Sequence, residues 1–275
     1  MRGLGLVSVV LVVSAAACAG APVSSPSPSA SATAAPTAAA VPADIVRSGT
    51  IVVGLPANPV LTTGKDPSGS PRGVGPDVIG ALAARMGVKV TWIDVTDNAK
   101  ALRDVESGAL DVLLISPDAA GADALAFVGY LEIDHTLLVP NGSAVKSFTD
   151  ADKPGVKIWV FKGAPVERTL GRAVKAATVV VRDWPTIAAF NADLQAGGWD
   201  AYAQNRQALL QLSDQIKGSR VLVDRFGSTV QSMGMKKGRA ELLAYLNDFV
   251  VEAKYSGLIK RSIETFKIQG VQPAP

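Results

Sequence analysis

Cysteine and histidine are nearly absent from this chain of 275 residues, which contains one of each. A single cysteine cannot form an internal disulfide, and no cluster of histidine, cysteine and carboxylate residues stands at the spacing of metal ligands. The catalytic patterns GxSxG, HExxH and CxxC are missing as well. The sequence therefore predicts neither a metal nor a redox cofactor, and it points away from an enzyme.

Charge is also scarce, because 19% of the residues are charged and the formal net charge is +3. No basic stretch with interleaved aromatic residues occurs, so nucleic acid is not an expected partner. Apolar residues make up 48% of the chain. Its length suffices for one large or two medium domains, so we expect a globular protein with a proper core.

The apolar run at the N-terminus is too short to cross a membrane. It covers residues 4–17 after Arg2, whereas a membrane-spanning helix needs about 20 residues. A run of this kind is typical of a secretory signal, so residues 1–17 are expected to be a signal peptide. Cys18 then resembles the acylated cysteine of bacterial lipoproteins, although Ala15 stands where that motif usually carries Leu. Ordinary cleavage after Ala19 or Ala21 is the alternative.

The next segment has no residue that could build a core. Residues 19–43 are drawn entirely from Ala, Gly, Pro, Ser, Thr and Val, and the prolines prevent a long helix. We expect residues 18–43 to be a tether with a reach of roughly 25–30 Å as a flexible coil. The folded part would then be exported to the periplasm or the outer face of the cell membrane, and a lipid on Cys18 would be its membrane anchor.

From residue 50 onward, strand and helix patterns alternate, which predicts an α/β protein with mostly parallel sheets flanked by helices. In a first unit we expect strands at 50–55, 88–95 and 109–116, and helices at 73–87 and 98–108. In a second unit we expect strands at 156–161, 178–182, 200–204 and 220–226, and helices at 164–174, 185–197 and 205–212. Extended crossings are expected at 135–140 and 228–235, and the amphipathic helices 240–255 and 258–266 end the fold.

An ordered set of segments carries a family resemblance. The segments are SGTIVVGL, GVGPDVIGALAARMG, VESGALDVLLIS-P, KIWVFKGAPVE, LQAGGWDAYAQNRQALL and GMKKGRAELLAYLNDFVVEAKYSGLIKRSIE. Together they resemble the extracellular solute-binding proteins of the polar-amino-acid type, which serve ABC importers. The resemblance implies a two-lobed periplasmic-binding-protein fold of type II with two hinge crossings and a ligand cleft. It also implies a discontinuous first lobe, 44–137 and 232–270, around a second lobe, 138–231, with a tail at 271–275.

In that frame, the loops after the strands supply the expected ligand-binding residues. Lys162, Gly163 and Ala164 precede a helix whose free N–H groups favour an anionic ligand group, although an ordinary strand-to-helix turn explains them equally well. Other expected contacts are Asn58, Ser116, Pro117, Gln204, Asn205 and Arg206. Lys162 pointing into solvent and Asn205 acting as a plain helix cap are the competing interpretations.

The resemblance also shows a departure from the family pattern. Amino-acid binders resemble TxxR in the loop after Ser116, but here the Arg position falls on Ala119, and the Asp that usually takes the ammonium group appears as Gln204. Leaving an ion without its partner in a desolvated site costs about 3–5 kcal/mol. We therefore expect an organic acid, an amine or an amino-acid-like solute to be passed to an ABC permease, but not a standard zwitterionic amino acid.

Two other functions remain open from the sequence. Cyclohexadienyl dehydratases, which act on prephenate or arogenate, share the fold, and Asp118, Asp123, Glu132, Asp134, Glu167 and His135 would be the candidate groups. A lone histidine in a strand is more often packed than catalytic, so this function is the alternative rather than the first expectation. A sensor domain would need a transmembrane helix and a signalling module downstream of the lobes.

Overall fold

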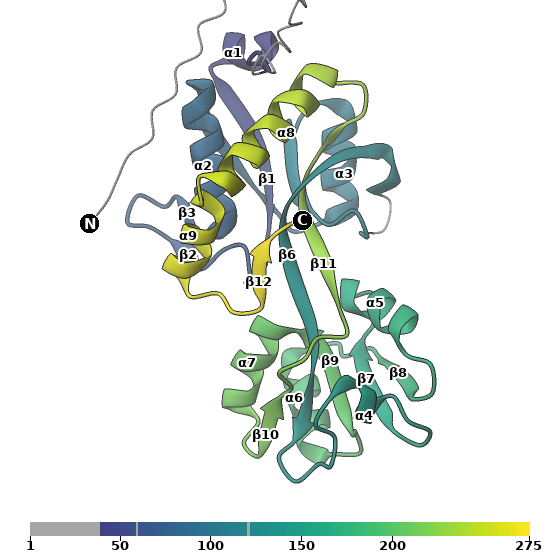
Figure 1. Ribbon diagram of the computed structural model, residues 1–275. Coiled ribbons are helices and arrows are strands. Elements are labelled where there is room, and N and C mark those ends of the chain that lie inside the picture. Colours follow the sequence, from purple (N-terminus) through teal and green to yellow (C-terminus); the bar gives the residue numbers. More distant parts are fainter. Residues whose placement is uncertain (1–38, 59, 120–121) are drawn as a thin grey trace, which may run out of the picture. The chain divides into compact units, whose positions relative to one another are not determined.

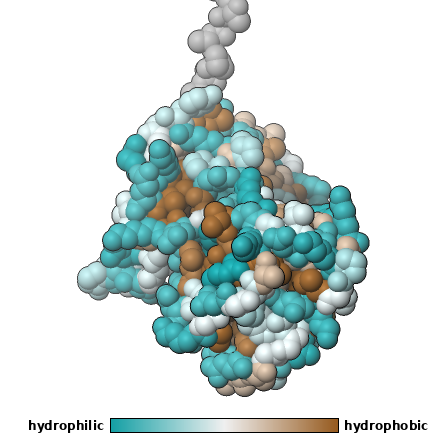
Figure 2. Space-filling model, turned by 60° about the horizontal axis from the view of Figure 1, so that its bottom comes forward, coloured by the Kyte–Doolittle hydropathy of each residue, from teal (hydrophilic) through white to brown (hydrophobic). Residues whose placement is uncertain are grey.

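The computed structural model describes residues 39–58, 60–119 and 122–275. The expected signal peptide, Cys18 and nearly all of the expected tether lie outside these residues. Within them, no helix is both long enough and apolar enough to cross a membrane. The face drawn in Figure 2 carries hydrophobic patches separated by hydrophilic residues.

The first lobe is a parallel sheet covered by helices (Figure 1). Its strands follow the order β4-β1-β5, with β1 Thr50–Pro56 between β4 Lys89–Val95 and β5 Val112–Ile115. Its helices are α1 Ala43–Ser48, α2 Val74–Met86, α3 Asn98–Ser107, α8 Ala240–Tyr255 and α9 Leu258–Phe266. The hairpin β2 Gly64–Lys65 and β3 Pro71–Arg72 precedes α2. Elements from both ends of the described chain thus build one lobe.

The second lobe repeats this plan within one continuous stretch. Its parallel strands follow the order β9-β7-β8, with β7 Lys157–Phe161 between β8 Thr178–Arg182 and β9 Ala201–Asn205. Its helices are α4 Phe148–Ala151, α5 Pro165–Ala173, α6 Ile187–Ala196 and α7 Arg206–Gln215. Pro165 at the first helical position of α5 and the Asn205 cap of α7 mark these helix starts chemically.

Two long antiparallel strands run through both lobes (Figure 1). They are β6 Leu125–Pro140, which follows the short turn η1 Ala122–Ala124, and β11 Gly227–Lys236. β11 also pairs with β5, and β6 pairs with β9, β10 Ser219–Val221 and β12 Val271–Pro273. The result is a ten-stranded sheet in the order β4-β1-β5-β11-β6-β9-β7-β8, with β10 and β12 on β6. The register of the β6–β11 ladder shifts between Gln231 and Ser232.

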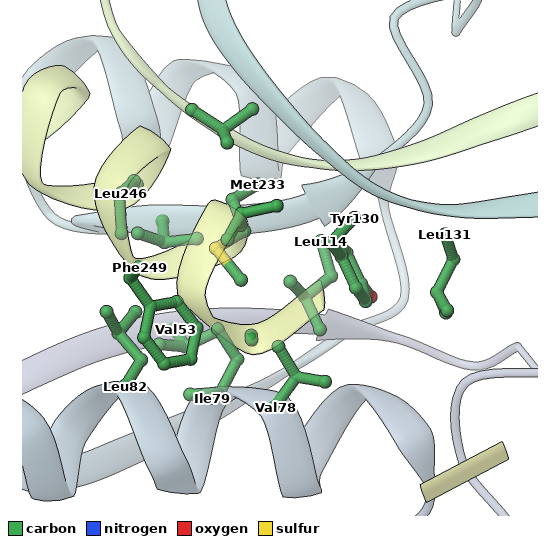
Figure 3. Packing of buried hydrophobic residues seen from close by; sticks show 14 of the residues in the cluster. Val53, Val78, Ile79, Leu82, Leu114, Tyr130, Leu131, Met233, Leu246 and Phe249 are labelled. Carbon is green, nitrogen blue, oxygen red and sulfur yellow. The ribbon is translucent and has the colours of Figure 1, made fainter. Parts of the chain in front are cut away.

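Each lobe is stabilised by apolar cores of its own. In the first lobe, Leu82 and Ile79 of α2 pack with Val53 of β1 and with Leu246 and Phe249 of α8 (Figure 3). In the second lobe, one cluster surrounds α5 and another lies on the opposite side of the sheet and contains three tryptophans: Trp159, Trp184 and Trp199.

In the middle of their length, the long strands pass from the core of the first lobe to the core of the second. On β6, Tyr130 and Ile133 belong to the first-lobe core, whereas Leu137 and Val139 belong to a second-lobe core. The residues around the change on both strands are buried but polar: His135, Thr136, Thr229, Gln231 and Ser232. We call this group the polar seam.

The elements expected from the sequence are found with small shifts in their ends, with two exceptions. The crossing strand expected at 135–140 begins ten residues earlier, at Leu125. The bounds of α8 and α9 are those expected, and Gly87 and Gly108 end α2 and α3 in left-handed conformations, with φ of 71° and 85°. The expected strand at 220–226 is wrong beyond residue 221. There, the carbonyl groups of residues 222–224 accept hydrogen bonds from the Arg206 and Thr136 side chains instead of a neighbouring strand.

Candidate functional site

A cavity of about 370 Å³ lies where the carboxyl-terminal ends of strands from both lobes meet. The loops after β1, β5 and β9 line it, together with the starts of α3 and α5 and the middle of β6 and β11. The ends of parallel strands are where open α/β sheets hold ligands. Four of the expected ligand contacts line this cavity: Asn58, Ser116, Gln204 and Asn205.

The first-lobe side of the cavity holds its polar side chains by local hydrogen bonds. The Asn58 Oδ1 atom accepts a hydrogen bond from the Val60 backbone N–H at 2.9 Å. The Ser116 Oγ atom accepts one from the Asp118 backbone N–H at 3.2 Å. Each side chain is therefore oriented by its own loop before any ligand arrives.

The polar side chains on the second-lobe side of the cavity are also held by local hydrogen bonds. The Gln204 Oε1 atom accepts a hydrogen bond from the Asn205 backbone N–H at 2.9 Å, and Asn205 Oδ1 accepts one from the Ala208 N–H at 2.8 Å. Asn205 is thus the N-cap of α7 as well as a cavity residue. The capping interpretation and the ligand-contact interpretation are compatible.

His135 belongs to the cavity wall at the polar seam. Its side chain is buried, and its Nε2 atom lies 3.0 Å from Thr229 Oγ1, whereas its Nδ1 atom has no partner among the described residues. Burial lowers the pKa of His135 to about 4, against the opposite influence of the carboxylates of Asp134 and Asp118. The imidazole is therefore neutral at pH 7.

The described lining of the cavity carries no Asp, Glu, Lys or Arg. Its polar members are amides, hydroxyls and the neutral imidazole, and its apolar members include Val60, Leu114, Ile133 and Val166. Ala119 and Gln204, which stand at the positions of the family's usual Arg and Asp, both line the cavity. The two positions are thus placed at the cavity, but without the charges.

The two cationic side chains expected at the ligand have other partners. The Lys162 Nζ atom lies 3.0 Å from Asp183 Oδ2, and Arg206 donates to the carbonyl groups of Leu222 and Val223. Gly163 donates its N–H to the Glu167 carboxylate, and Ala164 is the N-cap residue of α5. None of these four residues lines the cavity, and neither does Pro117.

Sequence reasoning missed several cavity residues. Asn98 begins α3, and Thr229 and Gln231 stand two residues apart on β11, so their side chains leave the strand on the same face. The alternation of polar residues in an otherwise apolar crossing strand was the available signal. His135 was expected only as a candidate group of the dehydratase alternative and not as a ligand contact, because a lone histidine in a strand is usually a packed residue.

Two α/β lobes, two crossing strands and a cavity at the strand ends are the arrangement expected of a solute-binding protein. The family of bacterial extracellular solute-binding proteins, family 3, matches residues 51–268, and the chain belongs to this family. Family membership indicates an exported protein. It also confirms the expected two-lobed α/β fold and the resemblance to binders of the polar-amino-acid type.

Solved structures share the fold at low sequence identity. An amino acid ABC transporter substrate-binding protein, AbpA, from Streptococcus pneumoniae bound to L-arginine is 20% identical, with a TM-score of 0.60, over 82% of this chain and 98% of its own. The substrate-binding protein of another amino acid ABC transporter is 22% identical, with a TM-score of 0.59, over 79% and 98%. The ancestral amino acid-binding protein AncCDT-1, a precursor of cyclohexadienyl dehydratase, is 24% identical, with a TM-score of 0.60, over 81% and 97%. None of the curated proteins matches the chain significantly.

Proposed function

We propose that the protein is the solute receptor of an ABC importer and delivers a small polar organic solute to a membrane permease. The observation that carries the proposal is the uncharged cavity between two lobes that share two strands. Residues 44–137 and 232–270 would form one moving body and residues 138–231 the other. A ligand that contacts both bodies would favour the closed arrangement.

The same cavity argues against a standard amino acid as the solute. A zwitterion would bring a carboxylate and an ammonium group into a lining whose described side chains carry no charge. Because an unpartnered ion in a desolvated site costs about 3–5 kcal/mol, the affinity should fall by hundreds- to thousands-fold. Glycine, glutamine and arginine should therefore bind far more weakly than the natural ligand.

Isothermal calorimetry with residues 44–275 and a panel of organic acids, amines, amides and amino acids tests the proposal. Ala119→Trp, which fills the cavity, should abolish binding of any hit, whereas Ala144→Trp at an exposed position should leave it intact. X-ray scattering should show a smaller radius of gyration with the hit. Tight binding of a standard amino acid would contradict the exclusion, and an unchanged scattering curve would contradict closure.

We further propose that Cys18, after removal of residues 1–17, carries a lipid that tethers the receptor through residues 18–43. Two or more acyl chains give stable anchoring, since each buried methylene contributes roughly 0.8 kcal/mol. Expressed in a bacterium, the chain should fractionate with membranes, and Cys18→Ala should move it to the soluble fraction. A wild-type chain cleaved after Ala19 or Ala21, seen by mass spectrometry, would contradict the anchor.

The dehydratase-like alternative finds one of its candidate groups at the cavity, the neutral His135, but none of its carboxyl groups. Glu132 and Asp134 pair with Arg225, and Glu167 accepts a hydrogen bond from Gly163. No described carboxyl group lines the cavity as a general acid or base. Incubation with prephenate should therefore show no turnover, and measurable product would favour the enzyme instead.

A further inference from the structure

Four polar side chains of the cavity have an acceptor atom that is already engaged by a backbone N–H, which leaves their donor groups for a ligand. A backbone N–H can only donate, so the side-chain atom that faces the Val60 N–H is the oxygen of Asn58, and the atom that faces the Asn205 N–H is the oxygen of Gln204. These bonds fix the orientation of both amides. The NH₂ groups of Asn58 and Gln204 are therefore the ends that can face a ligand, and the Gln204 side chain also hydrogen-bonds the Tyr202 hydroxyl.

Ser116 and Asn205 likewise have an acceptor atom that is engaged by a backbone N–H. The Ser116 oxygen already accepts from the Asp118 N–H, so its O–H remains to donate. The Asn205 oxygen accepts from the Ala208 N–H, and its NH₂ group donates one hydrogen bond to Gln204 Oε1 at 3.3 Å, which leaves one N–H. Four cavity side chains, two from each lobe, have thus had an acceptor atom occupied by their own backbone.

Three helices also begin at the cavity wall. Asn98 is the first residue of α3, Pro165 and Val166 are the first two of α5, and Asn205 caps α7. The first N–H groups of a helix have no partner within it, and this end of the helix dipole favours negative charge. Asp97 and Asn205 already accept one N–H each at the starts of α3 and α7, and Pro165 has none, so the dipoles of α5 and α7 are the contribution that favours an acceptor.

The described lining contains no carboxylate that would pair with an ammonium ion. The nearby carboxylates have cationic partners outside the wall: Asp118 lies 3.9 Å from Arg172, and Asp134 lies 2.8 Å from Arg225. His135 and Thr229 are hydrogen-bonded to each other. About half of the lining residues are apolar, which suits a hydrocarbon part of the ligand.

We propose that the cavity selects a small aliphatic monocarboxylate that carries no ammonium group, such as a 2-oxo acid. This inference rests on the proposed binding function and names the chemical class of its ligand. Neutral N–H and O–H donors from both lobes would satisfy the carboxylate oxygens, so the cost of an unpartnered ion falls mainly on an ammonium group, which has no carboxylate partner in the described lining. The same donors gain less from an amide of equal shape, because hydrogen bonds to a charged acceptor are stronger.

Calorimetry with matched ligands separates the alternatives. The probes are 2-oxo acids of three to six carbons, the amino acids of the same skeletons and the corresponding unbranched or branched carboxamides. The tightest 2-oxo acid should bind roughly ten- to a hundredfold more tightly than its amide and its amino acid. Equal or tighter binding of the amide or the amino acid would overturn the inference, and so would a panel in which no carboxylate binds.

Two isosteric variants test the donors themselves. Asn58→Asp and Gln204→Glu keep the oxygen that accepts the backbone N–H but replace the NH₂ donor with a charged acceptor. Each should weaken carboxylate binding at least about tenfold, whereas Asn247→Asp, at an exposed position on α8, should not. Unchanged affinity in both cavity variants, with melting temperatures that match the wild type, would overturn the inference.

Different results would overturn the ligand class and the receptor function. If the wider panel yields an amine or an amide that closes the protein, the receptor function stands and the ligand class is wrong. If Ala119→Trp leaves every hit intact, the cavity is not the binding site and both proposals fail.

Discussion

The two lobes have the same strand and helix plan but differ in how the chain builds them. The first lobe joins segments from both ends of the described chain. Its larger apolar cluster is mainly aliphatic and is completed by α8, and a smaller cluster lies around α3 and β5. The second lobe is continuous, and its sheet carries an aromatic cluster with Trp159, Trp184 and Trp199 on one side. One sheet can therefore support two cores of different composition, provided that polar residues occupy the strands between them.

The largest expected effect comes from a cavity in the first core. Leu246→Ala removes a fully buried side chain of α8 and should lower the free energy of unfolding by about 2–5 kcal/mol. Three of the four tryptophans lie in the second lobe, so tryptophan fluorescence reports mainly on that lobe. If the shared strands make unfolding cooperative, the fluorescence transition in urea should shift together with the circular dichroism transition. A shift in circular dichroism alone would show that the lobes unfold separately.

Acidification should lower the free energy of unfolding through His135 in the polar seam, rather than through either apolar core. The folded pKa of His135 is about 4, whereas an unfolded histidine titrates near its ordinary value of 6.5. The unfolded chain therefore binds more protons between these values, so stability rises with pH from 4 to 6.5, by roughly 3 kcal/mol. Urea titrations across this range should show the slope, and His135→Gln should reduce it. Asp134 and Asp118 act in the opposite direction, so an absent slope would mean that their influence outweighs burial.

Restoring charge on both sides of the cavity should change the ligand class. Ala119→Arg places a cation on the first-lobe side, and Gln204→Asp places an anion on the second-lobe side. The double variant should gain affinity for amino acids by about a hundredfold, and each single variant should gain much less, since one partner of the zwitterion stays unpaired. Calorimetry with L-glutamine and L-arginine on all four proteins measures the coupling. Equal gains in a single variant would contradict a paired role.

The smallest expected effect compares equivalent helix caps in the two lobes. Asp97 caps α3 by accepting the Lys100 N–H, and Asn205 caps α7 by accepting the Ala208 N–H. Replacing either residue with Ala should cost about 1 kcal/mol of stability. Asn205→Ala should also weaken the ligand, because Asn205 lines the cavity and Asp97 does not. Thermal melts with and without ligand separate the two effects.

Periodicity predicted most of the fold because the strands and helices bury one or both faces at regular spacing. The α8 residues Leu242, Leu246, Phe249 and Val250, for example, are buried as their helical spacing predicts. The strand at 220–226 failed because long-range side chains take its carbonyl groups. Such bonds join residues far apart in the sequence, so no local pattern indicates them.

The site was less predictable than the fold. The positions of Asn58, Ser116, Gln204 and Asn205 at one cavity follow from strand ends that a parallel sheet brings together. The interactions of Lys162 with Asp183 and of Arg206 with backbone carbonyls could not be read from residue types, because a cation suits a ligand and an internal partner equally well. His135 and Gln231 became visible as cavity residues only when two distant strands were paired.

The register shift in the β6–β11 ladder, where Tyr130 of β6 is the extra residue, bears on how this pair of strands can bend. It falls between Gln231 and Ser232, within the polar seam, and Gln231 is itself part of the cavity wall. A strand that carries a β-bulge can bend at the bulge, because the regular pairing of hydrogen bonds is already interrupted there. A ligand that contacts Gln231 would therefore touch the point at which the connection between the lobes can bend. Ligand binding and bending of the two strands would then be directly coupled.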